Sequence, residues 1–84
     1  MSEYRISDNL AVSESGFLFM ANSGESFTVN ETGRFIINSL KENKSEEEIL
    51  SSLTNEFDID IETAQRDFDE FLTLLRNLKL VEEL

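Results

Sequence analysis

The feature that most constrains this chain is an apolar stripe near its C-terminal end, which an α-helix would place on one face. The stripe consists of residues that recur at spacings of three and four: Ile61, Ala64, Phe68, Phe71, Leu75 and Leu78. Such spacing is typical of an amphipathic helix, and Asp60 is a suitable N-cap for it. Leu72 and Leu74 flank the stripe on opposite sides. Because one apolar helix face must be buried against other elements, the rest of the chain has to cover it.

Two further helices are predicted upstream of this stripe. Asn30 can cap the first, and Glu31 suits the positive end of its dipole. Ser45 and Glu48 match a capping box for the second. The apolar residues of the two helices follow at helical spacing: Phe35, Ile36, Ile37 and Leu40, then Ile49, Leu50, Leu53 and Phe57. We therefore expect three helices, all of them after residue 29.

The N-terminal part of the chain favours short strands. Apolar stretches separated by turn-prone polar residues lie at 4–6, 10–12, 17–20 and 26–29. The polar residues 22–25 include a glycine, which is typical of an antiparallel hairpin. We expect an α+β, winged-helix-like fold with three short N-terminal antiparallel strands followed by three helices. No proline, repeat or linker divides the chain, so residues 1–84 are expected to form a single domain.

The charge of the chain excludes several kinds of partner. It has 18 acidic and seven basic residues and a net charge of −11. Nucleic-acid binding depends on neutralised phosphates, so no nucleic-acid partner is expected. No membrane association is expected, since anionic surfaces repel the chain and no apolar run approaches the ~20 residues of a membrane span. The negative electrostatic potential of the chain would attract a basic peptide or protein. The simpler explanation of the net charge is that it keeps the domain soluble. The absence of an export signal indicates the cytoplasm.

The residue types also argue against catalysis. The chain has no histidine and no cysteine, which removes the commonest general base, metal ligand and thiolate nucleophile. The acidic run Glu46-Glu47-Glu48 is explained as the first turn of a capped helix. Asp58 and Asp60 lack the glycine and glutamate that complete a calcium loop. We therefore expect a binding module with no catalytic residue, no metal and no cofactor.

The segment from residue 27 to the C-terminus resembles the PqqD family, small proteins of pyrroloquinoline quinone biosynthesis and their relatives. Val29-Asn30-Glu31-Thr32-Gly33 is similar to the family's hydrophobic-Asn-x-Thr-Gly signature, and "SEEEILSSL" and "DFDEFLTLLRNLKLV" resemble its later helices. The resemblance implies a recognition element that binds the leader segment of a ribosomally made precursor peptide. The leader would add as a strand to the free edge of the third strand, beside the third helix. The domain would present it to a modifying enzyme, often a radical-SAM enzyme.

The resemblance also implies which residues bind the peptide. They are Ser26, Phe27, Thr28 and Val29 on the strand and Asp67, Phe71 and Leu74 on the third helix. Phe27 and Val29 share one strand face, which we place on the core, so that the other two strand residues point outward. The opposite helix flank carries Asp69, Leu72 and Arg76; the Asp67 flank is preferred because Asp67 belongs to the family-like "DFDEFL". Phe71 and Leu74 can also be explained as core residues, and for Phe71 core packing is the preferred interpretation.

Three positions depart from the family pattern. Ile37 replaces a frequent aromatic residue, Asn43 lies near a frequent glycine, and Lys79 stands where a glycine often precedes the last apolar pair. A residue other than glycine at Lys79 costs on the order of 1 kcal/mol if the backbone there is left-handed. These departures place the chain away from the quinone pathway itself.

Two other functions stay open at this point. A winged-helix transcription factor would need basic residues on its third helix, and a general protein–protein adaptor would need only an exposed surface. The sequence identifies neither the precursor peptide nor the maturation enzyme. It also leaves open a homodimer that forms through the exposed strand edge.

Overall fold

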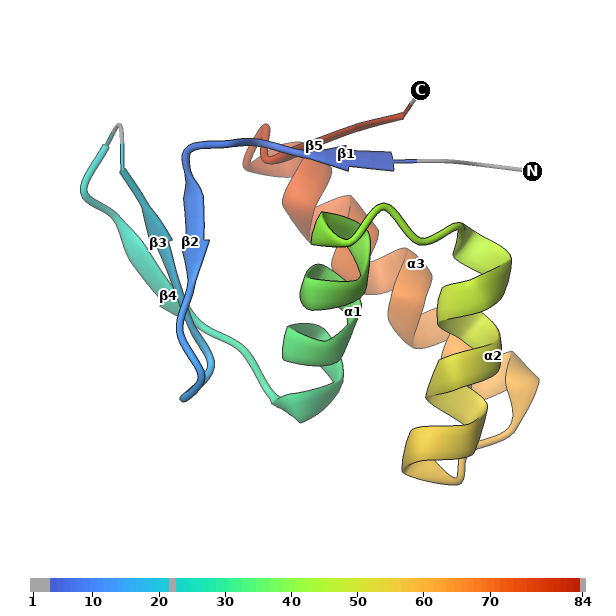
Figure 1. Ribbon diagram of the computed structural model, residues 1–84. Helices are drawn as coiled ribbons and strands as arrows, with labels where there is room; N and C mark the ends of the chain where they lie inside the picture. The colour runs from blue at the N-terminus through green and yellow to red at the C-terminus, as the bar shows by residue number, and fades with distance from the viewer. Residues whose placement is uncertain (1–3, 22, 84) are drawn as a thin grey trace.

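Among the described residues, four short strands precede three helices and a fifth strand follows them (Figure 1). The computed structural model describes residues 4–21 and 23–83, so Asn22 of the expected hairpin turn lies outside the described residues. The elements are β1 (Tyr4–Ile6), β2 (Leu10–Val12), β3 (Phe17–Met20), β4 (Ser26–Thr28), α1 (Glu31–Lys41), α2 (Glu46–Phe57), α3 (Ile61–Asn77) and β5 (Val81–Glu83). The predicted α+β class, with antiparallel strands before three helices, is confirmed.

The strands form two separate antiparallel sheets. β2, β3 and β4 make a three-stranded sheet in that order, with Leu18 opposite Val12 on one side and Phe27 on the other. β1 does not join this sheet but pairs with β5, which places Tyr4 opposite Glu83. The three predicted N-terminal strands correspond to β2, β3 and β4, which form one sheet. The two-stranded β1–β5 ribbon is a second sheet that the predicted architecture did not include. Figure 1 shows α1 between the three-stranded sheet and α2.

Each helix begins at the cap that the sequence predicts. The Asn30 Oδ1 atom accepts a hydrogen bond from the Gly33 N–H at 2.8 Å, and Ser45 begins a complete capping box. The Asp60 Oδ1 atom accepts a hydrogen bond from the Thr63 N–H at 2.8 Å. Hydrogen bonds from Thr63 lower the pKa of the Asp60 carboxyl, because they stabilise its charged form. The caps fix where each helix starts after the segment that precedes it.

One apolar cluster lies between the sheets and the helices. Its most deeply buried large side chains are Leu18, Ile36, Ile37, Leu40, Ile49, Leu53, Phe68 and Leu75. Leu80 and Val81 pack back onto this cluster beyond α3, as expected from the sequence. Across the described ranges, no helix is long and apolar enough to cross a membrane.

The buried face of α3 differs from the predicted stripe. Leu72 is only 3% exposed and belongs to the core, whereas Ile61 is 55% exposed. The face is centred on Phe68 and Leu75 and is rotated toward Leu72, which leaves Phe71 half-buried at its margin. The error arose because helical spacing gives the width of an apolar face but not the direction from which neighbouring elements cover it.

Replacing Lys79 with glycine should stabilise the domain by about 1 kcal/mol. Lys79 follows α3 with a φ of 60°, a left-handed conformation that is costly for a residue with a Cβ. The Leu80 N–H donates to the Leu75 carbonyl oxygen at 2.8 Å, which is the bond of a Schellman motif and favours glycine before Leu80. Urea denaturation would measure the gain. Lys79→Ala keeps the Cβ and should show none; equal stability of the two variants would contradict a strained turn.

Candidate functional site

β4 is an edge strand with one free side, since β3 is its one neighbour within the described part of the chain. The Val29 N–H donates to the Gly16 carbonyl oxygen at 2.8 Å, which makes this pair a hydrogen-bonded one. Bonded pairs alternate along an antiparallel ladder. The main-chain N–H and C=O groups of Ser26 and Thr28 therefore point away from β3, toward the free side, where a further strand can pair with them.

Glycine at position 16 is required for the pairing that holds this edge. Gly16 has a φ of +92°, and a Cβ built there would lie 2.8 Å from the Val29 carbonyl oxygen. A side chain would both strain the backbone and push Val29 away. Gly16, which precedes β3, therefore holds Val29 in place at the end of β4, where the chain turns toward α1.

The two faces of β4 have different environments. Phe27 and Val29 are half-buried and pack against the core, whereas Ser26 and Thr28 are exposed. This is the alternation expected from the sequence. A peptide that approaches the edge therefore meets main-chain donors and acceptors rather than large side chains.

A hollow of 280 Å³, here called the α1–α3 hollow, opens between the start of α1 and the middle of α3. Its lining residues are Asn30, Thr32, Gly33, Ile36, Asp67, Glu70, Phe71 and Leu74. Asp67, Phe71 and Leu74, the three helix residues predicted for peptide binding, thus lie together. Phe71 both packs against the core and lines the hollow, so the two interpretations of this residue are compatible. Leu72 on the opposite flank is buried instead.

Sequence reasoning missed part of this hollow. Thr32 and Gly33 belong to the signature that resembles the PqqD family, but that signature does not say which surface they line. Ile36 is fully buried, as expected of a core residue, and forms the closed base of the hollow. Helical spacing from Asp67 could have indicated Glu70, which lies three residues further along α3.

Gly33 allows α1 and α3 to lie close together at the hollow. A Cβ on Gly33 would lie 3.0 Å from the Phe71 Cε1 atom and 3.2 Å from the Val29 Cβ atom. The Phe71 ring therefore packs directly over the first turn of α1. Since Val29 is the residue that follows β4, this contact also links the strand edge to α3.

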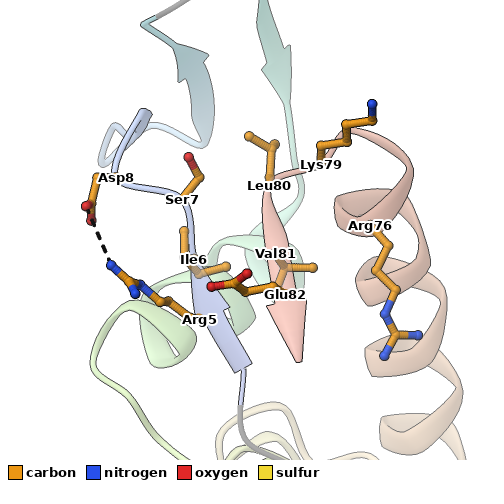
Figure 2. A pocket seen from close by; sticks show the side chains of 9 residues that line it. All are labelled: Arg5, Ile6, Ser7, Asp8, Arg76, Lys79, Leu80, Val81 and Glu82. Atoms are coloured by element: carbon orange, nitrogen blue, oxygen red, sulfur yellow. Dashed lines mark ion pairs between the residues drawn. The ribbon is translucent and has the colours of Figure 1, made fainter. Parts of the chain in front are cut away.

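A larger hollow, of 550 Å³, lies beside the β1–β5 ribbon. Figure 2 shows Arg5 beside Asp8, at 4.0 Å, and Arg76 and Lys79 on the other side of β5, with charged ends that point in different directions. Arg76 is also paired with Glu83 at 3.2 Å. These charges do not converge on one point. Among the residues that the structure describes, no group of three acidic side chains could hold a metal ion.

Comparison with known proteins identifies the family. The family described as "Coenzyme PQQ synthesis protein D (PqqD)" matches residues 16–81. No curated protein matches the chain in sequence. A solved chain described as "Lasso peptide synthetase B1 complexed with the leader peptide" is similar with a TM-score of 0.81 and 25% identity, over 95% of this chain and 98% of that one.

A second solved chain, described as "TbiB1 in Complex with the TbiA(beta) Leader Peptide", has a TM-score of 0.80 and 32% identity. The likeness covers 93% of this chain and 94% of that one. Both neighbours are therefore similar over nearly their whole length, and the resemblance inferred from the sequence is confirmed. With a family match over residues 16–81, this chain belongs to the PqqD family.

Proposed function

We propose that this chain is a non-catalytic peptide chaperone, which binds the leader segment of a ribosomally made precursor peptide and presents it to a modifying enzyme. The observation that carries the proposal is that the free edge of β4 continues directly into the wall of the α1–α3 hollow, through Val29 and Asn30. Both solved neighbours are described as complexes with leader peptides, which supports the same function.

The leader binds by β-augmentation in this proposal. It pairs with the outward main-chain groups of Ser26 and Thr28, so that hydrogen bonds supply affinity without reading side chains. Alternate side chains of the added strand face α3, and one of them enters the hollow against Phe71 and Leu74. Leu74 is 45% exposed, which leaves apolar surface for that side chain to cover.

The size of the hollow favours peptide recognition over catalysis. At 280 Å³ it is slightly below the range of roughly 300–1,000 Å³ that is usual for small-molecule sites. It accommodates one or two side chains of an extended peptide. Its polar residues are an asparagine, a threonine and two carboxylates, and the chain has no histidine or cysteine to act beside them. The chemistry therefore belongs to the partner enzyme, of the radical-SAM or another peptide-modifying class.

The proposal places residues 1–84 in the cytoplasm as one recognition domain, because ribosomally made precursors are available there before export. The free edge that takes the leader could alternatively pair with a second copy of the chain, and leader binding would then compete with a homodimer.

A winged-helix transcription factor is the less suitable alternative. The exposed side of α3, which would enter the DNA groove, carries Glu62, Asp69 and Glu70 against Arg66 and Arg76, so it does not form a basic surface. A general protein adaptor would bind another protein at the β4 edge, whereas a leader-binding domain would bind a leader peptide there, so the ligand distinguishes the two functions.

An amide NMR titration tests the proposed function. The ligand is the N-terminal segment of the short peptide encoded beside this chain's gene. We expect the shifts to concentrate in Ser26–Val29 and around Asp67, Phe71 and Leu74. Shifts at these positions caused by a neighbouring enzyme but not by the peptide would establish an adaptor and contradict leader recognition. Sedimentation of the same samples would show whether the peptide dissociates a homodimer.

Replacing Gly33 with alanine should lower leader affinity with little loss of stability. Alanine is the better helix former by up to about 1 kcal/mol, which offsets the close contacts that its Cβ makes with the half-buried Phe71 ring at 3.0 Å, the Val29 Cβ atom at 3.2 Å and the Asn30 Oδ1 atom at 3.3 Å. The ring has to move by a few tenths of an ångström and changes the hollow, so we expect about three- to tenfold weaker binding. Calorimetric titration and thermal unfolding measure the two effects. Asn38→Ala, on the exposed face of α1, is the control; equal leader affinity of the two variants would contradict a role for this contact.

A further inference from the structure

The rim of the α1–α3 hollow carries negative charge over an apolar floor. Asp67 and Glu70 lie three residues apart on α3, so they project on the same side of the helix. The apolar part of the lining consists of Ile36, Phe71 and Leu74. No lysine or arginine is among the lining residues. A ligand that fills this hollow therefore meets apolar surface and two carboxylates together.

These carboxylates are only weakly compensated within the described residues. The Arg66 Nε atom lies 3.8 Å from the Asp67 Oδ1 atom, but the Arg66 side chain is 67% exposed. Consecutive residues on a helix do not face one another, and such exposed pairs contribute little. The Asp67 side chain is 35% exposed, so its charge is partly shielded from water and acts on the hollow beside it. For Glu70, the structure records no ion pair among residues 4–21 and 23–83.

Apart from Arg66, the basic residues that the structure describes lie away from this rim; Lys41, for example, donates to the Leu10 carbonyl oxygen at 3.3 Å. Arg34 donates to the Glu14 carbonyl oxygen, and Lys44 is paired with Glu42 at 3.3 Å. Arg5, Arg76 and Lys79 line the hollow beside the β1–β5 ribbon instead. Arg66, which lies one residue before Asp67 and four before Glu70, can offset at most one of the two rim carboxylates, and with a net charge of −11 the potential at the rim stays negative.

We propose that the α1–α3 hollow selects leader segments in which a lysine or arginine lies two residues before or after the apolar side chain that enters the hollow. This inference rests on the proposed function, because it requires an extended peptide paired with β4. On an extended strand, residues two apart lie about 6.6 Å from each other on the same face. A long basic side chain at that spacing reaches Asp67 or Glu70 while its neighbour covers Phe71. The ligand of this site is thus an apolar and basic peptide motif.

Fluorescence anisotropy with a matched pair of variants tests the inference. The probe is the dye-labelled N-terminal segment of the short peptide encoded beside the gene. We expect Asp67→Asn/Glu70→Gln to bind it about tenfold more weakly at low salt and to lose most of the salt dependence. The control, Glu47→Gln/Glu56→Gln, removes the same charge from exposed positions on α2 and should bind like the parent. Replacing the lysines and arginines of the probe one at a time with glutamine identifies the partner residue.

Charge reversal makes the assignment specific. Glu70→Lys should bind the parent probe poorly and regain affinity for a probe in which the identified basic residue is replaced by glutamate. Parental affinity and salt dependence in the Asp67→Asn/Glu70→Gln protein would overturn the charge selection and leave leader recognition intact. A bound leader without lysine or arginine near its apolar anchor would have the same consequence. A probe that the parent domain does not bind at all would instead overturn the proposed function, and the selection with it.

Discussion

Replacing Thr28 with proline is expected to weaken leader binding by about 10- to 100-fold while the domain stays folded. The Thr28 N–H points to the free side of β4, so proline removes a main-chain donor from the surface that the leader would pair with. Its ring also occupies space at the edge. Without the Thr28 N–H, one carbonyl group of the leader stays unpaired. The free-energy cost of an unpaired carbonyl group is larger than the net stabilisation from a typical hydrogen bond. The hydrogen bonds of Val29 and Phe27 to β3 are not touched.

A second substitution at the same position separates the backbone from the side chain. Thr28→Ala keeps the N–H and should bind the leader like the parent protein. Proline is tolerated on the outward side of edge strands, and circular dichroism would verify that both variants are folded. Calorimetric titration then compares them. A folded Thr28→Pro protein with parental affinity would show that the leader does not pair with β4.

Truncating Phe68 to alanine should cost the domain about 3–5 kcal/mol of unfolding free energy. The Phe68 side chain is fully buried on α3, and its ring centroid lies 6.0 Å from that of Tyr4 on β1. Removing the ring leaves a cavity where α3 meets the β1–β5 ribbon. Domains of this size are stable by only about 5 kcal/mol or a little more. A large fraction of the variant should therefore be unfolded near body temperature.

Urea denaturation followed by circular dichroism measures this loss. Phe17→Ala is the matched control, because it makes the same truncation on a side chain that is 50% exposed. We expect the control to change the unfolding free energy by about 0.5 kcal/mol or less. Similar losses in both variants would contradict the assignment of Phe68 to the centre of the core.

Local features of the fold could be predicted from the sequence. Asn30, Ser45 and Asp60 cap the helices as expected, because capping depends on residues within one turn of one another. The left-handed backbone at Lys79 is also a local feature, since it ends α3 in a Schellman motif. The sequence pointed to it because Lys79 stands where the PqqD family often has a glycine. These features need no knowledge of the rest of the chain.

Features set by distant contacts could not be predicted. On α3, Leu72 is buried and Ile61 is exposed, the reverse of the predicted stripe. Which of them is buried depends on the direction from which the other elements cover that helix. The stretch 4–6 is recognisably strand-like, but its pairing with β5, which follows the last helix, joins opposite ends of the chain and separates it from the three-stranded sheet. Strand pairing between remote segments has no signature within either segment.

The candidate site lies between these two cases. The family resemblance supplied Asp67, Phe71 and Leu74, and the structure brings all three to one hollow. The opposite wall could not be predicted, because it depends on how closely α1 approaches α3. The 3.0 Å distance between a Cβ on Gly33 and the Phe71 ring is a property of that approach, and not of either helix alone.

Because β1 pairs with β5, the first described strand can form its ribbon only after the last strand has been synthesised. β2, β3 and β4 join residues that are close in sequence, whereas Tyr4 and Glu83 are separated by almost the whole chain. Closing so long a loop requires conformational entropy before any contact can offset it. On the ribosome, the residues of β2, β3 and β4 are all present before α3 has been made, but Tyr4 is not held against Phe68 by the ribbon until β5 has been made. The residues of the strand edge are therefore synthesised before α3, and the ribbon that holds β1 beside α3 is completed last.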